Sequence, residues 1–150
     1  MSDLCVVVDT SIAIKWAIKE EDSSIALALL NEWTAKDVLI LAPTLLAYEA
    51  TNALHKQIRK GTLPYEDAER ALHEVIYDLV SFTFLDDASL SVRAIQLAQQ
   101  FGLPATYDAH YLALAESRGC ELWTADTRMW NSLRGKLAWV RWLADYSTSS

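Results

Sequence analysis

Short apolar runs alternate along this chain with longer segments in which apolar residues recur every three or four positions. The short runs are rich in Val, Ile, Leu and Phe and end abruptly, which is typical of strands buried on both faces of a sheet. They predict strands at 4–8, 38–41, 82–85 and 121–124, and 137–143 is a fifth candidate.

The longer segments have the period of amphipathic helices. Ser, Thr, Asp or Pro mark their starts and Gly follows several of their ends, as expected at helix termini. The predicted helices cover 10–17, 22–33, 43–59, 64–79, 87–101 and 106–118. Helices between successive strands favour right-handed crossovers. We therefore expect an α/β fold, a three-layer α/β/α sandwich around a central parallel sheet of four to five strands.

The composition is that of one globular domain. The chain has 150 residues, is 52% hydrophobic and contains only four Gly and three Pro. That length fits a single domain spanning 1–150, and the apolar content is enough for a substantial core. We expect disorder only in the tail, 146–150.

Several classes of protein are disfavoured. Cys5 and Cys120 are far apart in sequence and lie in or beside apolar runs, so we expect two reduced thiols and neither a disulfide nor a zinc site. The N-terminus lacks a basic region before its short apolar run, and no run approaches the length of a membrane span. We expect a cytoplasmic protein.

Four acidic residues lie against apolar neighbours, where a charge is costly. They are Asp9, Glu49, Asp108 and Asp126. Asp9 and Asp126 come just after predicted strands, and the carboxyl ends of parallel strands meet at one edge of a sheet. Glu49 and Asp108 lie in the N-terminal halves of helices that begin near that edge. All four carboxylates should therefore converge.

Each acid also has a simpler interpretation when taken alone. Asp9 or Asp126 could cap the following helix, and Asp108 could favour the first turn of its helix through the macrodipole. Glu49 is harder to explain in this way, because its neighbours in the helix are apolar. Converging carboxylates are usually compensated by a hard cation such as Mg²⁺ or Mn²⁺, and such sites most often act on phosphate esters.

The residues around these acids resemble the motifs of the PIN-domain ribonucleases, and most closely those of VapC-type toxins. The segments that carry the resemblance are Val8-Asp9-Thr10-Ser11, Tyr48-Glu49-xx-Asn52, Tyr107-Asp108-Ala109-xx-Leu112-Ala113-Leu114-Ala115 and Thr124-Ala125-Asp126. The similarity runs from Asp9 to about Trp130 in the family's order. The chain departs from the family pattern after the last acid, where Thr127-Arg128-Met129-Trp130 follows, and this leaves substrate choice open.

The resemblance implies a single PIN-like domain and an endoribonuclease that depends on Mg²⁺, for which Mn²⁺ can substitute. Asp9, Glu49, Asp108 and Asp126 would be both the catalytic residues and the metal ligands. Thr10, Ser11, Asn52 and Thr124 would support them through hydrogen bonds. The family further implies an RNA substrate, a homodimer and a cognate antitoxin as partners.

The formal charge of −7 argues against binding nucleic acid by bulk electrostatics. Any contact with RNA should be local, and the candidates are Lys56, Arg59, Lys60 and Arg128. The first three are more usually a solvated helix end, which the helix dipole favours, and RNA contact is the alternative.

A homodimer is also suggested by an apolar excess for so small a domain, which includes Trp16, Trp33, Leu45, Leu46 and Leu54. Two rival functions remain at this point. One is a catalytically silent PIN-like module that binds RNA or protein, against which the intact carboxylates argue. The other is a phosphatase or phosphotransfer domain with Asp9 as nucleophile, but the second acid of an Asp-x-Asp motif is absent.

Overall fold

The computed structural model describes residues 4–83 and 88–147. Its centre is one parallel sheet with the strand order β3-β2-β1-β4-β5. The strands are β1 (Cys5–Val8), β2 (Leu39–Pro43), β3 (Ser81–Thr83), β4 (Glu121–Thr124) and β5 (Val140–Trp142). The prediction of a central parallel sheet is confirmed, with five strands.

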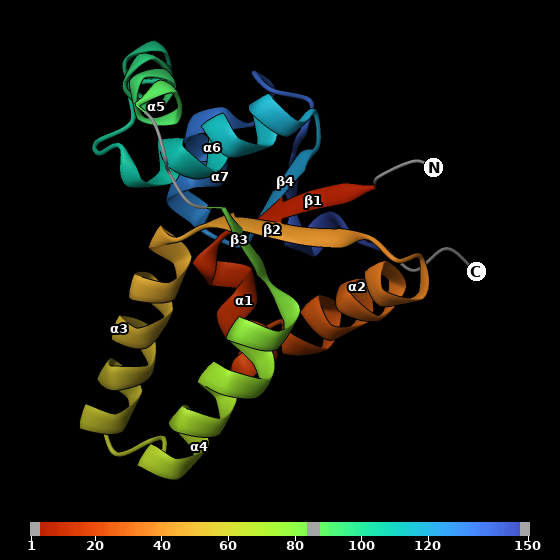
Figure 1. The fold of residues 1–150 in the computed structure, drawn as a ribbon, viewed down its shortest axis with the longest axis vertical. Helices are drawn as coiled ribbons and strands as arrows, with labels where there is room; N and C mark the ends of the chain where they lie inside the picture. The colour runs from red at the N-terminus through yellow and green to blue at the C-terminus, as the bar shows by residue number, and fades with distance from the viewer. Residues whose placement is uncertain (1–3, 84–87, 148–150) are drawn as a thin grey trace.

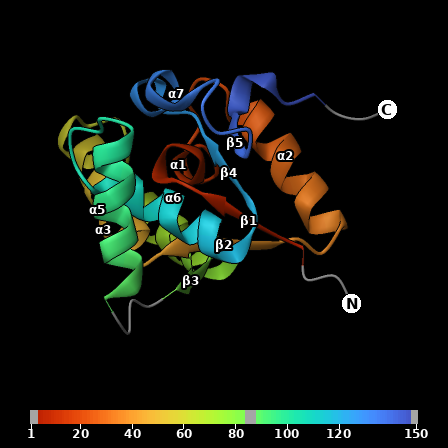
Figure 2. The same cartoon turned by 90° about the horizontal axis from the view of Figure 1, so that it is seen from above.

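Helices cover both faces of this sheet. They are α1 (Thr10–Ala17), α2 (Ser23–Ala35), α3 (Leu45–Arg59), α4 (Tyr65–Ala71), α5 (Ser89–Gln100), α6 (Tyr107–Arg118) and α7 (Thr127–Leu133). In Figure 1, α5 and α6 lie above the sheet and α1 to α4 lie below it, with α3 and α4 extending away as a hairpin. Seen from above, α5 packs outside α6 (Figure 2). The three-layer architecture is therefore as predicted.

Several boundaries differ from the predicted ones; Pro43, for example, was predicted to open a helix and instead ends β2. The segment predicted as one helix at 64–79 is α4 followed by a π-helical turn, Leu72–Tyr77. The third strand begins one residue earlier than predicted, and residues 84, 85 and 87 of our predicted elements lie outside the described residues. The fifth strand is shorter than 137–143, because a 3₁₀ turn, Leu143–Asp145, follows it directly.

The core absorbs most of the apolar residues that had suggested a dimer. Trp16 is 7% exposed, Trp33 6%, Leu46 0% and Leu54 3%. Trp33 packs edge-on against both Trp16 and Trp123, with ring centroids 6.2 and 6.1 Å apart. The prediction that one core could not absorb these residues is therefore wrong for four of the five. Leu45, which is half-buried, is the exception.

The two ends of the described chain lie beside this core. Tyr146, which we had placed in a disordered tail, packs edge-on against Trp123 at 6.1 Å, and 148–150 lie outside the described residues. Cys5 begins β1 and Cys120 immediately precedes β4, and both are free thiols. Burial and then a hydrogen bond with Cys5 raise the pKa of Cys120 to about 12.

Within the described ranges, no helix is long and apolar enough to cross a membrane.

Candidate active site

The four predicted acids come together at the carboxyl edge of the sheet. Asp9 directly follows β1 and Asp126 lies two residues after β4, and these strands are parallel neighbours. Asp108 is in the first turn of α6 and Glu49 in the second turn of α3. The charges of Asp108 and Asp126 each raise the pKa of Asp9, and those of Asp126 and Glu49 raise the pKa of Asp108, which requires proximity.

Asp9 is held by hydroxyls rather than used as a helix cap. It occupies the N-cap position of α1, but its side chain makes no capping hydrogen bond. Instead Ser11 Oγ donates to Oδ1 and Thr124 Oγ1 donates to Oδ2. The residue is 4% exposed, and burial, outweighing these hydrogen bonds, raises the pKa of its carboxyl to about 7. A buried aspartate that does not cap a helix is more easily explained as a metal ligand than as a structural residue.

The same hydroxyls tie the two strand ends to each other. Ser11 Oγ accepts a hydrogen bond from the Ala125 amide at 2.8 Å, and Thr124 Oγ1 accepts one from the Asp126 amide at 3.0 Å. Thr124 thus connects the backbone of Asp126 to the carboxylate of Asp9. The supporting positions expected for Ser11 and Thr124 are consistent with these contacts.

Glu49 is fixed by two hydroxyls on one of its oxygens. Thr10 Oγ1 donates to Oε1 at 3.0 Å, and Tyr111 OH donates to the same atom at 2.5 Å. Thr10 had been expected at the site, but Tyr111 had not. Its only sequence signal was a tyrosine on a mostly apolar helix three residues after Asp108, hence on the same helical face.

Asp108 and Asp126 differ from the other two acids. Asp108 is half-buried without a hydrogen bond from a described residue, and burial, followed by the charges of Asp126 and Glu49, raises its pKa to about 6. Asp126 Oδ1 accepts from the amides of Arg128 and Met129 at 2.9 and 3.1 Å. Asp126 therefore does cap α7, while its other oxygen accepts no hydrogen bond from the described part of the chain.

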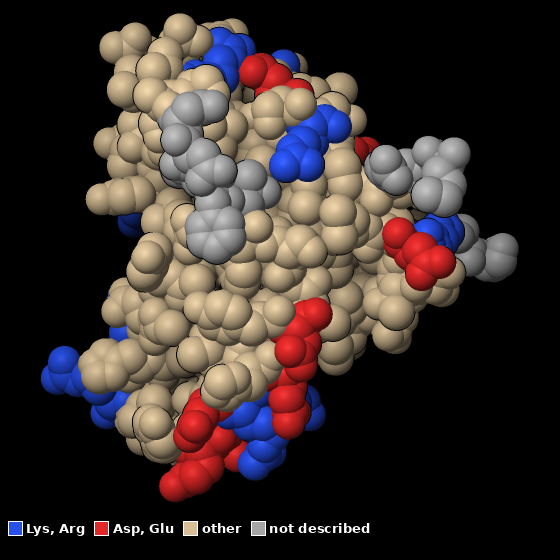
Figure 3. Space-filling view, viewed as in Figure 1, with Lys and Arg blue, Asp and Glu red and all other residues tan. Residues whose placement is uncertain are grey.

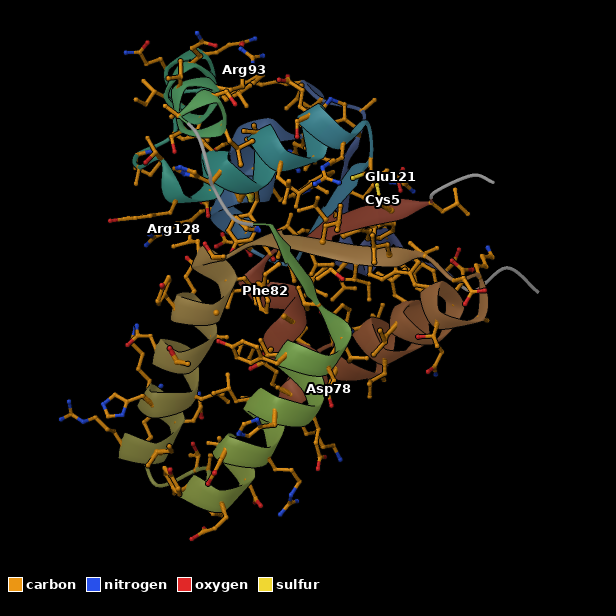
Figure 4. All side chains as sticks on the ribbon, in the orientation of Figure 1. Cys5, Asp78, Phe82, Arg93, Glu121 and Arg128 are labelled. Carbon is orange, nitrogen blue, oxygen red and sulfur yellow. The ribbon has the colours of Figure 1, made fainter. Side chains whose placement is uncertain are left out.

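Not every predicted residue reaches this cluster. Asn52 is exposed and shares no hydrogen bond with Glu49. Lys56, Arg59 and Lys60 lie at the far end of α3, about 10 to 16 Å along the helix axis from Glu49 at 1.5 Å per residue. Arg128 is exposed and lies beside Asp126 in the first turn of α7, where its amide donates to Asp126 Oδ1 (Figure 4).

The donor set suits a hard divalent cation. All candidate ligands are carboxylate oxygens, and burial first, then the charges of neighbouring acids, raise the pKa values of Asp9 and Asp108. Among the described residues, no three His, Cys, Asp or Glu side chains already enclose a point at which an ion could sit. Repelling carboxylates would have to draw closer around an ion, which neutralises them.

The surface around the site carries few cations. Among the described residues in Figure 3, those between the hairpin of α3 and α4 below and α5 and α6 above are mostly uncharged, and Lys and Arg lie mainly towards the extremities. Tyr48 and Tyr107, which precede Glu49 and Asp108, are 73% and 61% exposed and line one hollow together. Attraction of a polyanion to this face would be local.

Comparison with known proteins bears on these features. The sequence model of the PIN domain family matches residues 6–134. Ribonuclease VapC3 of Pyrobaculum aerophilum is 32% identical over 124 residues, which are 83% of this chain and 91% of that protein. Exonuclease VapC9 of the same organism is 38% identical over 93 residues, 62% of this chain and 66% of the relative.

Solved structures resemble the fold over nearly its whole length. The crystal structure of PAE2754 from Pyrobaculum aerophilum has a TM-score of 0.66 and 27% identity, covering 95% of this chain and 85% of the other. A toxin–antitoxin complex from Klebsiella pneumoniae contains a chain with a TM-score of 0.64 and 20% identity, covering 90% and 94%. This second likeness is one of fold.

Proposed function

The chain belongs to the PIN domain family, and we propose that it is a metal-dependent endoribonuclease that acts as the toxin of a toxin–antitoxin pair. The observation that carries the proposal is the convergence of Asp9, Glu49, Asp108 and Asp126 at one edge of the sheet. The relatives named ribonuclease VapC3 and exonuclease VapC9 support nuclease activity and a toxin role.

Asp9, Glu49, Asp108 and Asp126 would hold Mg²⁺, with Mn²⁺ as a substitute. When bound, the ion would activate a water molecule and neutralise charge on the phosphodiester. The chain's own contribution is orientation: Ser11 and Thr124 fix Asp9, and Thr10 and Tyr111 fix Glu49. The uncommitted oxygens are Oε2 of Glu49, both of Asp108 and Oδ2 of Asp126, within the described ranges.

RNA contacts would come from two places. Arg128, which follows Asp126 in the first turn of α7, would meet a phosphate beside the carboxylates. Lys56, Arg59 and Lys60 would meet only an RNA that extends along α3. We retain Asn52 as a candidate for a water-mediated contact, since it is exposed one turn from Glu49.

Two partners complete the proposal. A cognate antitoxin would inhibit the enzyme, in keeping with the toxin–antitoxin complexes among the fold neighbours, and an acidic toxin suits a partner with a basic segment. A second copy of the chain would form a homodimer. The protein would act in the cytoplasm.

The rival functions fit the geometry less well. An aspartyl nucleophile must be reached by the phosphorus of a bulky phosphate ester, whereas Asp9 is only 4% exposed. A catalytically silent module would have no need to keep four carboxylates together at a cost in repulsion.

Cleavage of a covalently closed circular RNA tests the proposal directly. An endonuclease opens the circle, whereas an exonuclease, the activity named for VapC9, acts only on linear RNA. We expect opening with Mg²⁺ or Mn²⁺, none with EDTA, and none by Asp108→Asn. Asp67→Asn, which alters an exposed carboxylate on α4 paired with Arg70, is the control and should cleave normally. EDTA-resistant cleavage, or a folded wild-type protein without activity towards either RNA form or any other RNA tested, would contradict it.

A further inference from the structure

We propose that Tyr111 is a positioning residue of the carboxylate site, whose buried hydroxyl holds Glu49 in the orientation needed to bind the cation. The inference rests on the proposed function, because it assumes that Glu49 is a ligand of a divalent ion.

The contact is made by a deeply buried phenol. Tyr111 is 1% exposed and is followed on α6 by buried apolar residues, Leu112 to Ala115. Its hydroxyl donates to Glu49 Oε1 at 2.5 Å and lies 3.1 Å from Thr10 Oγ1, which donates to the same oxygen at 3.0 Å. The three side chains come from α6, α3 and α1, so the triangle joins three helices at the edge of the sheet.

Both donors act on the same carboxylate oxygen, and this determines the orientation of the group. Because two hydroxyls donate to Oε1, the Glu49 carboxylate cannot rotate freely. The direction in which Oε2 points is therefore also fixed. No donor within residues 4–83 and 88–147 binds Oε2. Glu49 therefore offers one committed oxygen and one free oxygen, as expected of a ligand held ready for an ion.

The position of Tyr111 on its helix couples it to a second acid. Asp108 and Tyr111 are three residues apart on α6 and so share a face of the helix. One helix thus supplies a candidate ligand and also the group that orients another ligand from α3. The charge of Glu49 contributes, after burial and the charge of Asp126, to the raised pKa of Asp108. The carboxylates of Glu49 and Asp108 are therefore close to each other.

Packing alone does not account for a tyrosine here. Phenylalanine would fill the same volume without burying a hydroxyl, which is unfavourable unless it is hydrogen-bonded. The partners of this hydroxyl are Glu49 and Thr10, both at the site. A hydroxyl that only stabilised the fold would affect unfolding, whereas one that orients a ligand affects the affinity for the ion.

The test compares Tyr111→Phe, Thr10→Val and the double variant with the wild-type protein. Mn²⁺ affinity is measured by calorimetry without RNA, kcat and KM are measured with RNA, and melting is followed without metal. We expect Tyr111→Phe to weaken Mn²⁺ binding by about 10-fold or more, the range typical of groups that orient metal ligands. It should lower kcat while KM for RNA stays the same. Thr10→Val should act in the same direction, and the double variant should be weaker than either.

Tyr65→Phe is the matched control, because it removes a phenol hydroxyl from a 63% exposed residue at the start of α4. It should behave as wild type. A folded Tyr111→Phe protein with unchanged Mn²⁺ affinity overturns the inference while leaving the proposed function intact, and a lower melting temperature with unchanged affinity does the same. If Tyr111→Phe does not fold, Thr10→Val decides by the same criterion, because it frees the same oxygen. A wild-type protein that does not bind Mn²⁺ overturns this inference and the proposed function together.

Discussion

At the scale of single residues, Asp9 is the acid whose two interpretations the structure separates most clearly. Its carboxylate caps nothing and is surrounded by hydroxyls and like charges. Asp9→Asn should therefore abolish RNA cleavage and keep or raise the melting temperature without metal, because it removes a charge from a repelling cluster. Asparagine can still accept from Ser11 and can donate to Thr124. Retained cleavage with Mg²⁺, or a clear loss of thermal stability, would restore the simpler structural interpretation.

The raised pKa values of Asp9 and Asp108 predict how stability depends on pH without metal. Their pKa values rise from 3.8 to about 7 and about 6 on folding, so the folded protein binds more protons than the unfolded chain between about pH 4 and 7. The free energy of unfolding should therefore fall as pH rises through that window. Urea unfolding in EDTA at several pH values measures this slope.

Asp9→Asn is the control for that measurement, since it removes the larger of the two shifts and should flatten the slope. Saturating Mn²⁺ at pH 7.5 should restore stability to the wild-type protein, because an ion that binds only the folded state stabilises it. A wild-type slope unchanged by Asp9→Asn would show that the pKa of Asp9 is not raised.

At the scale of elements, Asp126 performs two tasks that substitution can separate. Its Oδ1 caps α7 through the amides of Arg128 and Met129. Asp126→Asn keeps this acceptor and removes the charge, so cleavage should be lost while stability stays near that of the wild type. Asp126→Ala loses the cap as well, which should cost about 1 kcal/mol of unfolding free energy. Equal melting temperatures for the two variants would mean that the cap contributes nothing.

The sequence pattern predicted the elements that position the site better than those away from it. The runs before Asp9 and Asp126 are short and apolar, and helix-start residues follow each of them. The sequence therefore predicted β1, β4 and the sheet edge at which both strands end. The π-helical turn at Leu72–Tyr77 could not be predicted from the sequence. One extra residue in a helical turn hardly changes the spacing of the apolar residues. For the same reason 64–79 had the pattern of a single α-helix.

Contacts between elements were the harder part of the site. Asn52 was chosen because it lies one turn from Glu49, but spacing along a helix does not give the direction in which the side chain finds a partner, and Asn52 faces solvent. Tyr111 was missed because its importance lies in reaching Glu49 from another helix, 62 positions away in sequence. The periodicity of a sequence shows which residues share a face of a helix. It does not show which residue of another helix will contact that face.

At the scale of the whole molecule, the proposed homodimer has to rest on other residues than those suggested by the sequence. Large apolar side chains are exposed on α3, α5 and α6, namely Tyr48, Val92, Ile95 and Tyr107, with 50 to 73% of their surface accessible. In Figures 1 and 2, α3 and α5 both lie towards the left edge of the molecule, although they are on opposite faces of the sheet. A two-fold contact there would bring two carboxylate sites towards one groove.

Light scattering at tens of micromolar protein should give the mass of a dimer for the wild type. Ile95→Asp places a charge on α5 at a 52% exposed position and should shift the protein to monomer without unfolding it, because the side chain has little burial to lose in the single chain. Leu27→Asp makes the same kind of change at a 44% exposed residue of α2 and should leave the dimer intact. A monomeric wild type, or a crystal form without a symmetric contact approaching the usual size of about 1,600 Å², would contradict the dimer. The nuclease proposal would survive that result, because Asp9, Glu49, Asp108 and Asp126 all belong to one chain.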